Sequence, residues 1–496
     1  MELNLYLVLG LPVLFSVIAT ANVLSKELLH WLNRITATMA AIAVGCIVRE
    51  FDPAVPYVSE YLYIDALSLW MLIIISTLYL AFAWTSKAYL DRDTNHRYGY
   101  LRRFEHLEGR FYALSHIFVW IMLVVVAVKN LGLMWVAIEA TTLVSALLVA
   151  FKFTRTSLEA AWKYVMVCTV GICLALLGTI LVYYMQLTSI GSENALDWLY
   201  IAKSGAVFDL NMAKFAFCFL FVGYGTKVGL APMHAWLPDA HSEAPALTSG
   251  LLSGSLCICA IYVLIRNIVI LMPTLGVDFI STLCLAFGLF TVAAAIPFVL
   301  VQRDVKRMLA YSSMENFGLM MAGLGLFVPL GAQGMLLHMF NHALVKYTLF
   351  FVAGTIMEEY GTKNMMRIHG MLQQVPRTAT FWLLSMAGIL GLPPIGIFFS
   401  KFNIIYGFFQ SDHPYLGILL LVLLAGMLIG ILYHVMRMLG DRPKRTSSGE
   451  LLGTIDSAAL AALLIFSGIV SGVLPELTTL NRLLEAATQI VLGGVI

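Results

Sequence analysis

The succession of apolar and polar stretches is the dominant pattern in this sequence. Apolar runs of roughly 17–25 residues, the length that a bilayer-spanning helix requires, recur along most of the chain. Three are centred near Leu11, Ala40 and Ile75, and the others cover 111–128, 131–151, 162–186, 212–230, 247–265, 279–301, 309–328, 334–357, 378–409, 416–439 and 457–473. A partly apolar tail, 477–496, is expected at the membrane interface. The pattern predicts an all-α polytopic membrane protein with about 14 transmembrane helices.

Composition agrees with a membrane protein and excludes several other classes. Hydrophobic residues make up 60% of the 496 residues and charged residues only 12%, whereas soluble domains carry about 25% charged residues. The net charge of +2 gives no reason to expect a nucleic-acid partner. The seven cysteines lie in apolar runs without a C-x-x-C pair, so we expect neither a metal nor another cofactor. No nucleophile–base arrangement indicates a catalytic centre in this chain.

Loop charge predicts the orientation in the membrane. Twenty of the 30 lysines and arginines lie in the loops after odd-numbered helices, and the loops after even-numbered helices are poor in them. Cytoplasmic loops carry the excess of basic residues. We therefore expect a multi-pass protein of the cell (inner) membrane with both termini outside. The apolar run 3–23 has no basic residues before it and no A-x-A site after it, which favours a spanning helix over a cleavable signal.

Two segments rich in glycine and proline interrupt the apolar pattern, at 229–238 and at 391–396. The prolines predicted to break the helices are Pro232, Pro238, Pro393 and Pro394. Proline removes a backbone hydrogen bond, and broken helices at matching places in two halves are typical of transporters with inverted repeats. Incidental loop prolines are the alternative. The predicted divisions are 1–110 (three helices and a basic cytoplasmic loop), 111–270 and 279–440 (five helices each), and 441–496 (the last helix and the tail).

Several charged residues lie where the apolar pattern allows none. An ionisable side chain at mid-membrane costs roughly 2.5–3.5 kcal/mol on insertion scales. Four lysines lie inside apolar runs, namely Lys163, Lys227, Lys346 and Lys401, while six other basic residues, Arg266 among them, are assigned to helix ends or outer loops. Glu139 and Lys227 lie on different helices and are expected to form an ion pair, in which each shifts the other's affinity for protons. The alternative is a permanent staple between two helices.

A stripe of titratable residues is predicted on one helix. His338, His342 and Lys346 are spaced at i, i+4 and i+8, which gives about 40° of drift and about 6 Å of rise per step. All three therefore line one face, and histidine passes protons near neutral pH. A lone histidine on an apolar face is usually a satisfied core residue, but three groups in register favour a proton relay. Lys401, just beyond the second break, is the predicted end of this path.

These segments resemble the antiporter-like subunits shared by respiratory complex I, membrane-bound nickel–iron hydrogenases and Mrp-type sodium/proton antiporters. The resemblance rests on 135–151 with Glu139, 227–245 with Lys227, 304–313, 338–346, and 391–401 with Lys401. The stretches 237–245 (LPDAHSEAP) and 312–318 (SSMENFG) are similar to the hydrogenase-4 component F type. The resemblance implies fourteen helices with two inverted five-helix repeats, and proton translocation driven by redox chemistry in other subunits.

One departure from the family pattern concerns the link between the two halves. Family members commonly carry a lysine or histidine on the helix after the first break, but 248–263 offers only serines, cysteines and one tyrosine as polar groups. A continuous proton relay between the two halves then needs bound water, or the side chains of Lys306 and Glu315 must reach across the gap.

The leading interpretation is a non-catalytic, proton-translocating subunit of a hydrogenase-4 or complex I-type complex, with other membrane and peripheral subunits as partners. The alternative is a stand-alone or Mrp-type cation/proton antiporter or an ion-coupled uptake module. A third interpretation is a structural anchor whose charges only hold helices together. The sequence does not separate H⁺ from Na⁺ as the transported ion.

Overall fold

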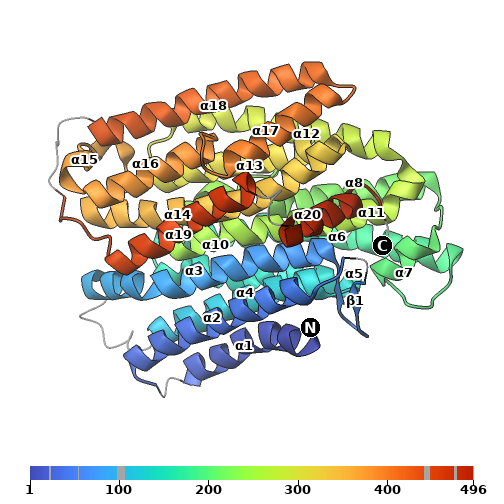
Figure 1. The fold of residues 1–496 in the computed structure, drawn as a ribbon, viewed down its shortest axis with the longest axis horizontal. Helices are drawn as coiled ribbons and strands as arrows, with labels where there is room; N and C mark the ends of the chain where they lie inside the picture. The colour runs from blue at the N-terminus through green and yellow to red at the C-terminus, as the bar shows by residue number, and fades with distance from the viewer. Residues whose placement is uncertain (22–23, 54, 98–106, 441–446, 474–477, 495–496) are drawn as a thin grey trace.

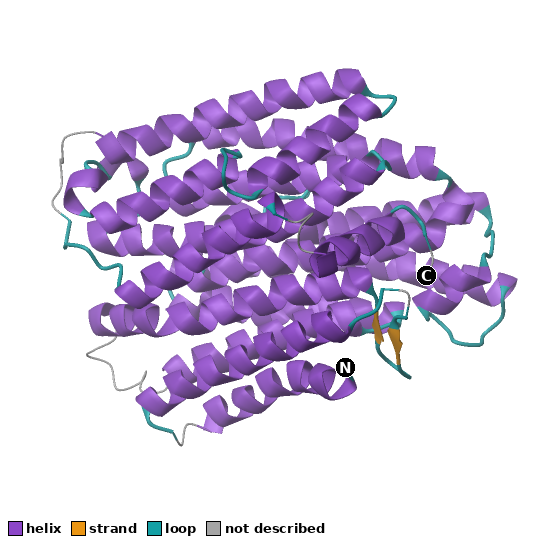
Figure 2. Ribbon diagram, in the orientation of Figure 1, coloured by secondary structure: helices purple, strands orange, loops and turns teal. Residues whose placement is uncertain are grey.

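The computed structural model describes residues 1–21, 24–53, 55–97, 107–440, 447–473 and 478–494 as one bundle of helices (Figure 1). Eleven of the described helices are long and apolar enough to cross a membrane. Helices dominate because each satisfies its own backbone hydrogen bonds, as lipid requires. Figure 2 shows the one described hairpin, formed by β1 (Tyr57–Val58) and β2 (Tyr63–Ile64), at the edge of the bundle. The prediction of an all-α polytopic membrane protein is confirmed.

The helices follow the predicted segments closely. The N-terminal division contains α1 (Glu2–Ala21), α2 (Lys26–Glu50) and α3 (Ala66–Arg97). The next contains α4 (Leu107–Ala127), α5 (Leu131–Val149), the turn η2 (Ala150–Lys152), α6 (Arg155–Ser189), α7 (Trp198–Ser204), α8 (Leu210–Val228), α9 (Leu237–Glu243), α10 (Ala246–Leu251), η3 (Leu252–Leu256) and α11 (Cys257–Leu275). Arg102 and Arg103, in the predicted basic loop, lie outside the described residues.

The second half has a similar order of elements. It contains α12 (Val277–Val301), α13 (Val305–Gly325), α14 (Pro329–Tyr360), η4 (Met365–Arg367), α15 (Met371–Gln374), α16 (Pro376–Leu390), α17 (Ile397–Gln410) and α18 (Pro414–Gly440). Two more helices, α19 (Thr454–Gly472) and α20 (Thr478–Val491), follow. Figure 1 shows α19 and α20 lying across the bundle, where both pack on α3 and α14. The tail predicted at the interface thus buries Leu484 and Val491 within the protein.

The two breaks are built in the same way. The C-cap residue is Gly229 in helix α8 and Gly391 in helix α16, and both glycines have positive φ (90° and 84°). At both breaks the backbone N–H of the next residue, Leu230 or Leu392, donates to the carbonyl five residues earlier in the chain. This hydrogen bond is typical of a Schellman C-cap. The chain then resumes as α9 and α17. Glycine adopts positive φ without strain, so Gly229 and Gly391 can end the first helix of each pair. The second helix of each pair, α9 or α17, begins a few residues later.

Helix α14 is the central element of the second half. The most apolar stretch of α14 is buried over its whole length. The helix packs against α10, α13, α16, α17 and α19. The titratable stripe at 338–346 therefore faces protein on all sides. Burial of this helix by both halves places the predicted relay in the middle of the bundle.

Candidate functional site

A hydroxyl bridges the glutamate and the lysine of the first half. Lys227 is fully buried at the end of α8, and its Nζ donates to Thr142 Oγ1 at 2.7 Å and to Tyr164 OH at 2.9 Å. Thr142 Oγ1 in turn donates to Glu139 Oε2 at 3.1 Å, one turn earlier on α5. The expected direct ion pair is therefore wrong in its geometry. The two charges are linked through one hydroxyl that is both acceptor and donor.

The hydroxyls around this pair compensate for desolvation of its charges. Glu139 Oε1 accepts a second hydrogen bond from Thr169 Oγ1 of α6 at 3.0 Å. The ammonium of Lys227 also lies over the ring of Tyr164, 5.1 Å from the ring centre, where a cation is attracted by the π-face. A buried ammonium is costly without such partners. Neutral hydroxyls stabilise the charge without fixing it as firmly as a carboxylate would.

The second half contains a direct ion pair. Lys401 Nζ of α17 lies 3.1 Å from Glu315 Oε1 of α13, and both side chains are buried. The expectation that Glu315 reaches across to the first half is wrong, because its carboxylate is occupied by the lysine beyond the second break. Each break thus has a carboxylate and an ammonium beside it, Glu139 with Lys227 at the first break and Glu315 with Lys401 at the second. The i, i+4 spacing could not point to Glu315, because Glu315 lies on α13 and the stripe lies on α14.

The predicted stripe connects to this ion pair through an amide. The Nε2–H of His338 donates to Asn316 Oδ1 at 2.8 Å, and Asn316 Nδ2 donates to Glu315 Oε2 at 2.5 Å. The other ring nitrogen of His338 lies 2.9 Å from Ser400 Oγ, which precedes Lys401. The rings of His338 and His342 are 6.3 Å apart. The stripe is buried and in register, as its spacing predicts.

Lys346 closes the stripe without a carboxylate partner among the described residues. It is fully buried, and its Nζ donates to the carbonyl of Leu309 on α13 at 2.8 Å. An ammonium at such a position is held by one carbonyl dipole only.

The predicted gap between the halves contains a distorted helical turn. The segment η3 (Leu252–Leu256) is a π-helix, a feature frequent at functional sites. Its Ser253 Oγ lies 2.7 Å from Ser313 Oγ on α13 and 3.5 Å from His342 Nε2 on α14. A hydroxyl of the helix after the first break thus contacts the stripe of the second half.

His241 is a buried titratable residue that the spacing analysis did not single out. It lies on α9, within the stretch 237–245, and its ring stacks on Phe350 of α14 at 5.0 Å. Neither ring nitrogen has a hydrogen-bond partner among the described residues. Since Phe350 follows Lys346 by one helical turn, His241 carries a titratable group of the first half to the edge of the stripe. The only sequence signal was its place in the motif.

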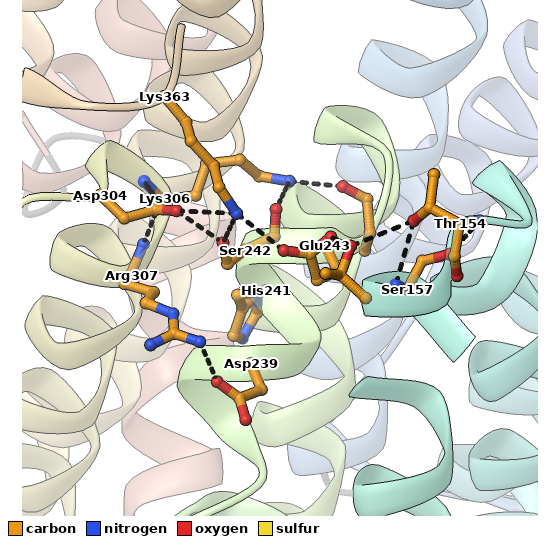
Figure 3. A network of polar contacts seen from close by, with 12 residues as sticks. Thr154, Ser157, Asp239, His241, Ser242, Glu243, Asp304, Lys306, Arg307 and Lys363 are labelled. Atoms are coloured by element: carbon orange, nitrogen blue, oxygen red, sulfur yellow. Dashed lines mark hydrogen bonds and ion pairs between the residues drawn. The ribbon is translucent and has the colours of Figure 1, made fainter. Parts of the chain in front are cut away.

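Lys306 of the second half does reach across to the first half, but its contacts are backbone carbonyls and not the side chains of Lys227 or His342. It is buried at the start of α13, where its Nζ donates to the carbonyls of Ala244 and Ser242 at the end of α9 (Figure 3). A cation at this position complements the negative end of a helix. Lys306 thus joins the second half to the short helix after the first break.

Ion pairs surround this junction at one end of the bundle (Figure 3). Lys363 Nζ lies 2.7 Å from Glu243 Oε1 and 3.3 Å from Asp304 Oδ2, and Arg307 pairs with Asp239. Partial burial lowers the pKa of Lys363, but its hydrogen bond to Glu243 and the nearby carboxylates outweigh this effect and raise it above its usual value. The short helix α9 is therefore connected by ion pairs to the first turn of α13 and to the turn after α14.

The predicted prolines occupy different parts of the breaks. Pro232 lies in the unwound segment after α8, and Pro393 and Pro394 lie in the one after α16. Pro238 is instead at the first turn of α9, where the missing N–H costs nothing. Lys163 is half-exposed and pairs with Glu159 and Asp239, so it belongs to the charged end of the bundle. The structure therefore brings Glu139 and Lys227 together, and separately His338, His342, Lys346 and Lys401.

Broken spanning helices with buried ionisable side chains beside them are features of ion-transporting membrane proteins. A family model described as "NADH:quinone oxidoreductase/Mrp antiporter, TM" matches residues 128–429, which is more than half of the chain. The protein belongs to this family, as an antiporter-like, integral multi-pass membrane subunit.

Individual relatives agree with the family assignment. A hydrogenase-4 component F homolog of Methylacidiphilum infernorum is 30% identical over 437 residues, which cover 87% of this chain and 89% of that protein. An NADH-quinone oxidoreductase subunit N of Desulforudis audaxviator is 32% identical over 308 residues, 61% of this chain and 60% of that one. In the membrane-bound sulfane sulfur reductase, an archaeal respiratory membrane complex, one chain has the same fold, with a TM-score of 0.85, 20% identity and coverage of 100% and 98%.

Proposed function

We propose that this chain translocates protons as a non-catalytic membrane subunit of a redox-driven complex of the hydrogenase-4 or complex I type. One observation carries the proposal: a buried row of titratable groups, Lys346, His342 and His338, leads to the Glu315–Lys401 ion pair. Ionisable groups are too costly in a membrane protein's interior to be retained without a role. The names of the curated relatives support an assembly with other subunits.

In the first half, the proposed step is release of a proton from Lys227. While Thr142 links Lys227 to Glu139, the negative charge holds the proton on the ammonium. When Glu139 moves away or takes up a proton, the buried ammonium loses its counter-charge and releases its proton. A bridging hydroxyl makes this change easier, because a single side-chain rotation breaks the link.

In the second half, the proton passes along α14 towards Lys401. His342 and His338 each exchange a proton in either direction. Buried water is expected between Lys346 and His342, because His342 Nδ1 has no partner among the described residues and such groups are rarely left unsatisfied. The Glu315–Lys401 pair then repeats the release step of the first half.

The proposed link between the halves uses His241 and Ser253. His241 belongs to the first half and stacks on α14, and Ser253 approaches His342. Together with water at the two free ring nitrogens of His241, they supply the central step for which 248–263 has no lysine or histidine. We further propose a cell (inner) membrane location with both termini outside, as the loop charges predict.

A Lys227→Ala variant tests the proposal. The complex containing this chain is purified, reconstituted in liposomes and supplied with its electron donor, and proton uptake is followed with a pH-sensitive dye. We expect the coupled proton signal to fall several-fold while electron transfer remains measurable. Lys203→Ala, at the exposed end of α7, is the matched control. An unchanged proton-to-electron ratio in the Lys227→Ala complex would contradict the proposal.

A second preparation distinguishes the antiporter alternative. The isolated chain, reconstituted without other subunits, is exposed to a pH gradient with Na⁺ on one side. A redox-dependent subunit shows no cation-driven proton exchange under these conditions. Exchange that Lys227→Ala abolishes would favour the stand-alone antiporter instead.

A further inference from the structure

A large cavity at the charged end of the bundle is not used by the proposed proton path. Its volume is about 600 Å³, within the range of about 300–1,000 Å³ found for small-molecule sites. Its walls come from α3, η2, the start of α13, the end of α14 and the turn after α14. Segments far apart in the sequence thus meet around one hollow.

The side chains around this cavity are mainly cationic. Arg92, Lys152, Lys306 and Lys363 line it, with Glu358 as the one carboxylate of the lining. Thr362 adds a hydroxyl at the rim. Four ammonium or guanidinium groups from four separate elements line one space, and a lining dominated by positive charge attracts anions.

Nearby carboxylates offset much of this charge, but those of Glu243 and Asp304 bond directly to Lys363 and not to Lys306. Arg92 Nε lies 3.1 Å from Glu358 Oε2, and Lys363 is paired with Glu243 and Asp304. Lys306 is buried and bonded only to the carbonyls of Ala244 and Ser242, with no carboxylate within 4.0 Å in the described part of the chain. A buried ammonium held by neutral carbonyls beside a cavity lacks the anion that such groups normally have.

The positive charge of the lining points to an anionic ligand, and the volume leaves room for one that carries further groups. We propose that the cavity binds a phosphate group, either as a free phosphate compound or as the headgroup of an anionic phospholipid. Lysine and arginine are the side chains that bind phosphate, and the Thr362 hydroxyl adds a neutral donor. The site lies at the end of the bundle that carries the basic loops, so the anion is drawn from the cytoplasm or the inner leaflet.

Binding to the intact complex tests the proposal. The complex in phosphatidylcholine nanodiscs is titrated with inorganic phosphate by isothermal calorimetry. A second preparation contains phosphatidylglycerol, and lipid that stays bound is counted by native mass spectrometry. The variant is Lys152→Gln with Thr362→Glu, and Lys203→Gln, far from the cavity, is the control. Thermal unfolding of each complex verifies that the variant is folded.

We expect saturable binding of one probe, weakened at least tenfold in the double variant and unchanged in Lys203→Gln. Binding of inorganic phosphate identifies a free anion as the source, and retention of phosphatidylglycerol alone identifies a lipid headgroup; either result supports the site. The proposal is overturned if neither probe binds saturably, or if the folded double variant binds as wild type does. It is also overturned if crosslinking from the cavity captures an acidic segment of a partner subunit and no phosphate binds. The readout is binding and does not depend on proton translocation.

Discussion

At the scale of single residues, hydroxyl and amide side chains connect the charges of this protein. Thr142 stands between Glu139 and Lys227, and Asn316 stands between His338 and Glu315. Such groups cost little to bury when both their donor and acceptor are used. They determine which ionisable groups communicate, although none of them carries charge.

The bridging role of Thr142 predicts the effect of Thr142→Val. Valine has nearly the same shape but no hydroxyl, so Lys227 and Glu139 each lose a hydrogen bond. Because a buried charged group is left with fewer partners, we expect a stability loss of about 1–3 kcal/mol and clearly slower proton translocation. Thermal unfolding and dye-monitored proton uptake measure the two effects. Thr142→Ser keeps the bridge and is expected to behave as wild type; equal impairment of both variants would refute the bridging role.

The buried Glu315–Lys401 pair predicts non-additive effects. Glu315→Gln leaves Lys401 buried without its counter-charge, which typically costs about 3–5 kcal/mol. Glu315→Gln combined with Lys401→Met removes both charges, so most of the stability is expected to return. Chemical unfolding of the single and double variants gives the interaction energy.

Translocation separates the proton path from a structural staple. If the pair only holds α13 to α17, the double variant pumps normally. We expect it to be stable but inactive in dye-monitored proton uptake, because neither remaining side chain carries a proton in the physiological range.

At the scale of elements, the two breaks depend on the backbone freedom of glycine. Gly391 has a φ of 84°, and a Cβ atom there would lie 3.1 Å from Cδ of Lys401. The break therefore both ends α16 and positions the terminal lysine of the path. The π-turn η3 is a second local distortion, and it brings Ser253 towards α13 and α14.

We accordingly expect Gly391→Ala to destabilise the protein by roughly 1–2 kcal/mol, the usual cost of a side chain in the left-handed region. Gly10→Ala is the matched control, because Gly10 lies in α1 with open space around its Cα. There the change is expected to be neutral or to stabilise by up to about 1 kcal/mol. Unfolding midpoints in detergent compare the two. Similar midpoints for both variants would show that the left-handed conformation at 391 carries no strain.

At the scale of the whole molecule, the charged end fixes the two halves to each other. Asp239 and Glu243 on α9 are paired with Arg307 and Lys363 of the second half. Ion pairs thus connect α9 to the first turn of α13 and to the turn after α14. Figure 1 shows the marks N and C at one end of the bundle, opposite the C-terminal ends of helices α1, α3 and α18.

This arrangement predicts the topology of reporter fusions. Alkaline phosphatase, which is active only outside the cytoplasm, is fused after residue 496. We expect high activity, because the loop charges predict a C-terminus outside the cytoplasm. A fusion after residue 450, between α18 and α19, is the control and should be inactive. The reverse pattern of activities would invert the proposed orientation.

The sequence by itself determined the features that depend on local pattern. Apolar run length predicted the spanning helices, glycine followed by proline predicted both breaks, and i, i+4 spacing placed His338, His342 and Lys346 on one buried face. These features follow from helix geometry and backbone sterics, which act between residues close in the chain. The motifs likewise identified the family to which the chain belongs.

Only the tertiary structure decided which groups from different helices meet. It placed Thr142 between Glu139 and Lys227, paired Glu315 with Lys401, and set His241 against α14. It also buried Arg266, expected at a helix end, in a bidentate ion pair with Asp65. The physical reason is that such partners depend on how whole helices pack, and a desolvated charge is stable only when the packing supplies its partner.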